Sequence, residues 1–210
     1  NLKKEYASRR AKVLKALKGS AGLVFAGHSD ESIQTSWRPH SHFEYLTGIT
    51  NEPEAVLLFD PTHPVSSRRE ILFLASRDPE KEHWEGIRKP LGRELQNEVG
   101  MTTLLRKKLL PFVLADLSSR CKRFATLMPI SSVQQRLSQD PEMYRQISDR
   151  TPECEIIDES SLIPSLRSIK SSAETKIIQE AVDITAKGFA AAFSFVKSGV
   201  NEFQVQATLE

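Results

Sequence analysis

Short apolar runs that stop at glycine, proline or polar turn residues constrain this chain most. Residues 23–26 end at Gly27, and residues 55–59 end at the turn pair Asp60-Pro61. Runs of four or five apolar residues suit buried strands better than helices. We expect strands at residues 23–26, 43–47, 55–59, 71–75, 124–127 and 155–157. In the run at 43–47, the alternation of Phe43, Tyr45 and Thr47 predicts a strand with one face turned inward.

Stretches with helical periodicity surround these runs. Tyr6, Val13, Leu14 and Leu17 form one apolar stripe of an amphipathic helix over residues 5–17. The further helices that we expect cover residues 79–85, 104–117 and 131–147, the last with a break at Asp140-Pro141. A helix, then strands with short links, then strands that alternate with helices predict an α/β domain with a mixed β-sheet flanked by helices.

The pattern changes after Leu166. Ser171 followed by Glu174 matches a capping box, and apolar residues then recur at helical spacing as far as Val196. Another helix begins at Glu202 and runs to the last residue, where its apolar face lacks a partner. We therefore expect two parts, residues 1–166 and residues 167–210, the second of them truncated.

Composition excludes several classes of protein. Of 210 residues, 39% are hydrophobic and 27% charged, and the net charge is only +2, so we expect a soluble protein without a nucleic-acid partner. No stretch approaches the ~20 apolar residues that cross a bilayer. Cys121 and Cys154 match neither a zinc motif nor a disulfide framework, which favours a reducing, cytoplasmic location. Because the chain starts at Asn1, a removed export signal stays open as an alternative.

One histidine pair suggests metal chemistry. His40 and His42 would share a face of a strand and could supply part of a zinc site. Such a site needs a third ligand, and the candidates His28, Asp30 and Glu31 have no spacing that enforces it. We expect exposed or hydrogen-bonded histidines here, and no metal bound by this chain.

Four segments resemble one enzyme family. Residues 43–58 contain an aromatic-Leu-Thr-Gly sequence followed by Glu-Pro-Glu-Ala-Val, and residues 82–88 contain Trp-x-Gly-x-Arg. Residues 167–174 contain Arg-x-x-Lys-Ser-x-x-Glu, and residues 197–202 form a Gly-x-x-Glu turn. In this order they resemble the N-terminal region of the aminopeptidase P, prolidase and creatinase family, and Xaa-Pro aminopeptidase most of all.

The resemblance implies a fold and an activity. It implies a ribonuclease-H-like α/β domain at residues 1–166, followed at 167–210 by a linker and the first helices of a pita-bread metallopeptidase domain. The complete enzyme would remove the N-terminal residue from peptides with proline in second position. It would use two divalent metal ions, manganese or else zinc or cobalt, held by two Asp, one His and two Glu that all lie beyond this chain.

The resemblance also implies partners and site residues. The expected partners are the chain's own C-terminal catalytic domain, proline-containing peptides and further copies, in a homodimer or homotetramer. The substrate-binding candidates are Trp84, whose ring would line the approach to a catalytic site, and Arg88, which would attract a peptide carboxylate. The alternative for Trp84 is that it only packs a helix on the sheet.

Two departures from the family pattern stand out. His42 occupies a position where the family often has Asn or Asp, so a role carried by a carboxylate there does not transfer. Ser198 replaces a proline and affects only the stiffness of a turn. Competing interpretations are an Xaa-Pro dipeptidase, a creatinase-like hydrolase, or an oligomerisation module without an enzyme.

Overall fold

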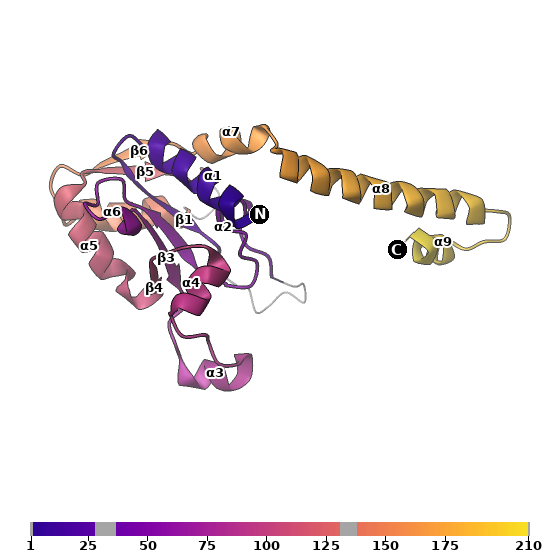
Figure 1. Ribbon diagram of the computed structural model, residues 1–210, viewed down its shortest axis with the longest axis horizontal. Coiled ribbons are helices and arrows are strands. Elements are labelled where there is room, and N and C mark those ends of the chain that lie inside the picture. The colour runs from indigo at the N-terminus through magenta and orange to yellow at the C-terminus, as the bar shows by residue number, and fades with distance from the viewer. Residues whose placement is uncertain (1, 28–36, 131–137, 210) are drawn as a thin grey trace. The chain divides into compact units, whose positions relative to one another are not determined.

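A mixed sheet organises the first part of the chain (Figure 1). The computed structural model describes residues 2–27, 37–130 and 138–209, without the side chains of Lys81, Trp84 and Glu85. Within these residues the sheet has six strands in the order β4-β3-β2-β1-β5-β6. They are β1 (Ala21–Phe25), β2 (Val56–Phe59), β3 (Glu70–Leu74), β4 (Leu104–Arg106), β5 (Arg123–Thr126) and β6 (Glu155–Asp158).

One strand runs against all the others. β2 pairs antiparallel with β1 through Leu23↔Leu58 and with β3 through Leu58↔Ile71. The pairs β1–β5, β3–β4 and β5–β6 are parallel, so the carboxyl ends of five strands meet at one edge of the sheet. β1 and β2 are buried along their whole length, which requires cover on both faces.

Helices supply that cover. Figure 1 places α5 and α6 on one side of the sheet and α1 on the other. The Tyr144 hydroxyl of α6 accepts a hydrogen bond from the Leu23 N–H at 2.7 Å and donates one to the Ala125 carbonyl at 3.2 Å, which ties the helix to β1 and β5. The helices of this part are α1 (Leu2–Ala16), α2 (Ser41–Thr47), α3 (Pro79–Glu85), α4 (Arg93–Val99), α5 (Leu110–Arg120), α6 (Gln139–Ser148) and α7 (Leu162–Ser168), with 3-10 turns at Ser66–Arg68 and Lys107–Leu109.

The expected mixed α/β sheet is confirmed, but the strand expected at 43–47 is wrong. These residues belong to α2, because local caps favour a helix there. The His40 imidazole accepts a hydrogen bond from the His42 N–H at 3.2 Å at the start of the helix. At its end Gly48 has φ 69° and donates its N–H to the Glu44 carbonyl at 2.7 Å. The buried positions His42, Phe43, Leu46 and Thr47 follow a helical spacing, and the apparent alternation does not describe burial.

The helix expected at 104–117 is also wrong in its first half. Leu104–Arg106 forms the edge strand β4, in register with Leu72–Leu74. Helix α5 begins only at Leu110, with Pro111 in its first turn, where a missing N–H costs nothing. The same rule places Pro141 in the first turn of α6, so no break divides the described helix 139–148, while residues 131–137 lie outside the described residues.

Contacts divide the chain into two compact units, Asn1–Arg167 and Ser168–Glu210. The second unit consists of α8 (Ser172–Phe195) and α9 (Glu202–Leu209), which contact each other. The predicted capping box is confirmed: the Ser171 hydroxyl accepts from the Glu174 N–H at 3.2 Å, and the Glu174 carboxylate accepts from the Ser171 N–H at 2.9 Å. Within the described residues, no helix is long and apolar enough to cross a membrane.

Candidate functional site

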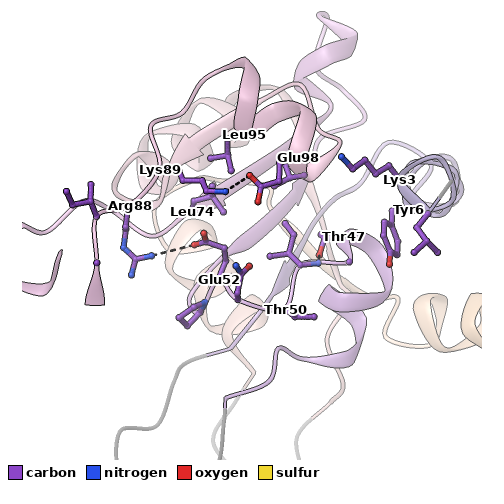
Figure 2. Close-up of a pocket in the computed structure, with 18 residues that line it drawn as sticks. Lys3, Tyr6, Thr47, Thr50, Glu52, Leu74, Arg88, Lys89, Leu95 and Glu98 are labelled. Carbon is purple, nitrogen blue, oxygen red and sulfur yellow. Dashed lines mark hydrogen bonds and ion pairs between the residues drawn. The ribbon is translucent and has the colours of Figure 1, made fainter. Parts of the chain in front are cut away.

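A cavity of about 780 Å³ lies where two of the sequence motifs meet (Figure 2). Its walls come from the start of α1, the turn after α2, the segment that follows α3, and α4. The residues that line it include Lys3, Tyr6, Gly48, Asn51, Glu52, Pro53, Arg88, Lys89 and Glu98. Segments that are far apart in the sequence therefore contribute charged groups to one open pocket.

The turn after α2 forms the floor of this cavity and is held tightly. Gly48 combines its positive φ with close contact to the Tyr6 ring, and any side chain at this position would collide with that ring. Glu54 also has a positive φ of 64°, and its N–H donates to the Gly27 carbonyl at 2.8 Å. The Lys107 ammonium lies 3.1 Å from the Glu54 carboxylate. These contacts hold the backbone on both sides of Glu52.

Glu52 and Arg88 form the central ion pair of the pocket. Arg88 Nη1 lies 3.5 Å from Glu52 Oε2, and the two side chains are 22% and 27% exposed. Burial raises the pKa of Glu52, and the positive charges of Arg88 and Arg106 oppose that rise. The structure thus joins the predicted residue Arg88 to the Glu-Pro-Glu motif, although the contact is long.

A second ion pair closes the neighbouring wall. Lys89 Nζ lies 2.6 Å from Glu98 Oε2 of α4, and both side chains are at least half exposed. Lys3 of α1 donates to the Asn97 carbonyl at 2.6 Å. Figure 2 shows these groups around the same opening as Glu52 and Arg88. The pocket offers cationic and anionic groups side by side, which suits a ligand that carries both charges.

The other predicted residue, Trp84, belongs to α3, and its side chain lies outside what the structure describes. Gly86 has φ 91° and its N–H donates to the Glu82 carbonyl at 3.1 Å, so α3 ends before Arg88. Trp84 and Arg88 therefore do not share one helical face. Ile87 between them is 82% exposed.

The histidine pair is arranged differently from the expectation. His42 is buried and its ring lies 4.8 Å from that of His40, edge to face. Burial, followed by the charges of His40 and Arg167, lowers the pKa of His42 to about 4, so the ring is neutral at pH 7. The described residues contain no group of three or more His, Cys, Asp or Glu that could hold a metal ion. His28, Asp30 and Glu31 lie outside the described residues.

Sequence reasoning missed the acidic partners in the pocket. Glu52 stands inside a motif that the sequence displays, but its pairing with Arg88 crosses 36 positions and needs the fold. Glu98 lies in α4, a short helix that was not predicted, because its sequence has no clear apolar periodicity. The signal that could have found Glu52 is the opposite charge of two motif residues, each of which lies in a loop.

Comparison with known proteins gives one consistent result. The family model described as "Aminopeptidase P, N-terminal domain" matches residues 6–125. An Xaa-Pro aminopeptidase of Haemophilus influenzae is 27% identical over 99% of this chain and 46% of its own length. Xaa-Pro aminopeptidase 3 of Dictyostelium discoideum is 29% identical over 99% of this chain and 41% of its own length.

Solved structures agree with this result. Aminopeptidase P from E. coli with the inhibitor Pro-Leu superposes with a TM-score of 0.75 at 26% identity, over 99% of this chain and 48% of that one. The chain spans about half the length of the relatives it matches. Since the family model covers more than half of its residues, this chain belongs to the aminopeptidase P N-terminal domain family.

Proposed function

We propose that this chain is the N-terminal, non-catalytic part of a metal-dependent Xaa-Pro aminopeptidase, which releases the N-terminal residue of peptides with proline in second position. The observation that carries the proposal is the similarity to Xaa-Pro aminopeptidases over 99% of the chain, and not only over its sheet. An Xaa-Pro dipeptidase, a creatinase-like hydrolase and an oligomerisation module without enzymatic activity are the alternatives.

Residues 167–210 would be the linker and the first helices of the catalytic pita-bread domain, after an N-terminal domain at residues 1–166. The apolar residues of α8 and α9 support this assignment. Ile184 is 70% exposed and Phe193 78% exposed, although both lie in a helix with a strong apolar pattern. A helix of this kind is stabilised by a partner that covers its apolar side.

Two divalent metal ions, manganese or else zinc or cobalt, would activate water for attack on the peptide carbonyl in the complete enzyme. The described residues do not fit that role, since they contain no cluster of metal-ligating side chains. We assign to the chain itself the shaping of the substrate channel and the assembly of copies into a homodimer or homotetramer.

Trp84 and Arg88 would act on the peptide. An aromatic ring suits the rigid, apolar ring of proline at little cost in entropy. Arg88 would attract the carboxylate of a short peptide, in competition with Glu52. The position of Arg88 supports this, because it lines the pocket beside Glu52, where a carboxylate that enters the pocket can approach its guanidinium.

Opposite effects of two substitutions test the role of Arg88 in the full-length protein. Arg88→Gln removes the charge and should raise KM about tenfold for short Xaa-Pro peptides. Glu52→Gln removes the competitor and should lower KM. If Arg88 serves only as a structural partner of Glu52, both substitutions raise KM or neither changes it.

Trp84→Ala tests the aromatic contact. It should lower kcat/KM by the equivalent of about 1–2 kcal/mol, and the melting temperature of the variant is measured beside its kinetics.

The activity itself is tested with the full-length natural protein and manganese. Release of the first residue from Xaa-Pro-Xaa tripeptides, with no release from matched peptides that have alanine in second position, supports the proposal. Cleavage of Xaa-Pro dipeptides alone would favour a prolidase, and no cleavage of either would contradict an aminopeptidase. The 210-residue chain alone should release nothing.

A cytoplasmic location completes the proposal, and the two free cysteines support it. Cys121 is buried and Cys154 partly buried, and neither forms a disulfide. Free thiols are typical of a reducing compartment. We propose no nucleic-acid or membrane partner.

A further inference from the structure

An arm leaves the sheet after β3 and returns before α4. Residues 75–78 lead out, α3 forms the tip, and residues 86–92 lead back. Figure 1 shows α3 at the end of this arm, away from the strands. The arm holds Trp84 in its helix and Arg88 in its returning segment, so both predicted substrate residues depend on how its base is fixed.

Arg106 joins the two ends of that base. It is the last residue of β4 and lies in register with Leu74, the last residue of β3. Its Nη1 donates to the Ala75 carbonyl at 3.1 Å, at the start of the arm. Its Nη2 donates to the Lys89 carbonyl at 2.6 Å, in the returning segment. One side chain therefore bridges two backbone carbonyls that are 14 residues apart in the sequence.

The chemistry of this bridge calls for arginine. A guanidinium presents five N–H donors in a rigid plane and can serve two carbonyls at once, while an ammonium is a compact donor on a flexible stem. A neighbouring contact reinforces the base, since the Lys108 N–H donates to the Ser76 hydroxyl at 3.1 Å. Arg106 also contributes positive charge near Glu52, which links the bridge to the pocket.

The returning segment is held from three directions. Arg106 binds the Lys89 carbonyl, Glu98 binds the Lys89 ammonium at 2.6 Å, and Glu52 pairs with Arg88 at 3.5 Å. Lys89 and Glu98 are at least half exposed, so their ion pair contributes little by itself, and the contact between Arg88 and Glu52 is long. The bond from Arg106 reaches the backbone of the segment and anchors it to the sheet, through β4.

We propose that Arg106 is a positioning residue, which sets the arm so that Trp84 and Arg88 meet the substrate. This inference rests on the proposed function, since it needs those two residues at a peptide site. Loss of the bridge would leave the catalytic groups untouched and would disorder one wall of the approach. Substrate binding would weaken while the chemical step stayed the same.

The test uses Arg106→Gln and Arg106→Lys in the full-length protein, with Arg123→Gln as the matched control. Arg123 is half exposed and pairs with Glu155 at 3.3 Å at the start of β5, away from the arm. We expect KM for Xaa-Pro tripeptides to rise about tenfold in both Arg106 variants, with kcat within about twofold of the wild type. The lysine variant keeps the positive charge but loses the planar guanidinium, so it separates the effect of geometry from that of charge. The Arg123→Gln control should have the KM and kcat of the wild type.

Hydrogen exchange of the 210-residue chain gives a readout without activity. In both Arg106 variants, the amides of residues 76–92 should exchange faster than in the wild type. The exchange rates in β1, β2 and β5 should not change. Faster exchange throughout the sheet, or a loss in kcat with KM unchanged, would overturn the proposal, as would variants that match the wild type in both assays. If the wild-type protein cleaves no Xaa-Pro peptide, the proposed function fails, while the exchange result still decides whether Arg106 holds the arm.

Discussion

The two units of this chain differ in how far their apolar side chains are buried. In Asn1–Arg167, side chains such as Leu57 and Phe73 are fully buried in one core between the sheet and its helices. In Ser168–Glu210, Ile184, Phe193 and Phe203 are all more than 60% exposed. Both units consist of regular secondary structure, and α8 has a clear apolar face. The difference shows that periodicity predicts which face of a helix is apolar, while burial depends on what covers it.

The largest effect is expected when one phenylalanine is replaced in each unit. Phe73→Ala should lower the free energy of unfolding by about 3–5 kcal/mol, because it opens a cavity in a packed core. Phe193→Ala removes the same atoms from a side chain that is 78% exposed and should change it by less than about 0.5 kcal/mol. Urea unfolding followed by circular dichroism measures both, and equal losses would contradict the comparison.

The next test concerns a charge inside the first unit. The Arg10 side chain is 2% exposed and donates to Glu70 at 2.8 Å and to the Leu46 and Gly100 carbonyls, each at 3.0 Å. Arg10→Met removes the donor to these three acceptors, so we expect the free energy of unfolding to fall by about 3 kcal/mol.

The control for Arg10 is Arg123→Met, which breaks an exposed ion pair and should cost less than about 1 kcal/mol. Unfolding in urea compares the two variants. A loss at Arg123 as large as that at Arg10 would show that burial does not govern the cost.

These cases show where sequence reasoning succeeds. Strands β1, β2, β3, β5 and β6 follow from short apolar runs with clear stops, because such runs suit strands better than helices. The capping box at Ser171 follows from two residues three positions apart. Such local signals need no knowledge of the rest of the chain.

The errors come from contacts that a sequence does not display. β4 is a strand because it pairs with β3, and its leucines also fit a helical spacing. α2 is a helix because His40 and Gly48 cap it, which outweighs the alternation of its aromatic residues. In the site, Arg88 was predicted from a motif, while Glu52, Lys89 and Glu98 gather around it only after folding.

A smaller effect concerns pH and the buried His42. Its pKa is lowered from 6.5 to about 4, so the unfolded chain binds a proton between these values while the folded chain does not. Stability is therefore lost as the pH falls from 6.5 to 4, by an amount on the order of 2 kcal/mol. The advantage of the wild type over His42→Gln should shrink by that amount across this window.

The raised pKa values of Glu52 and Asp140 have the opposite sign, because these carboxyls take up protons first in the folded state. Both groups are present in the two proteins, so their contribution cancels in the difference. Parallel pH profiles for the wild type and His42→Gln would contradict a buried, neutral His42.

The smallest effect concerns the start of α8. Ser171→Ala removes a cap that satisfies the Glu174 N–H and should destabilise the first turn by about 1 kcal/mol. Amide exchange in residues 172–176 should quicken, while β1 stays unchanged. An equal change in β1 would mean that the two units unfold together.

Hydrogen exchange of α8, in this chain and in the full-length protein, tests whether residues 167–210 belong to a larger domain. We expect the α8 amides in the 210-residue chain to exchange far faster than those of β1 and β2. Among the residues of α8 and α9 that the structure describes, only Ala192 is buried. In the full-length protein α8 should gain protection comparable to the sheet. Protection of α8 equal to that of β1 in the 210-residue chain, or no gain in the full-length protein, would contradict the assignment of residues 167–210 to a larger catalytic domain.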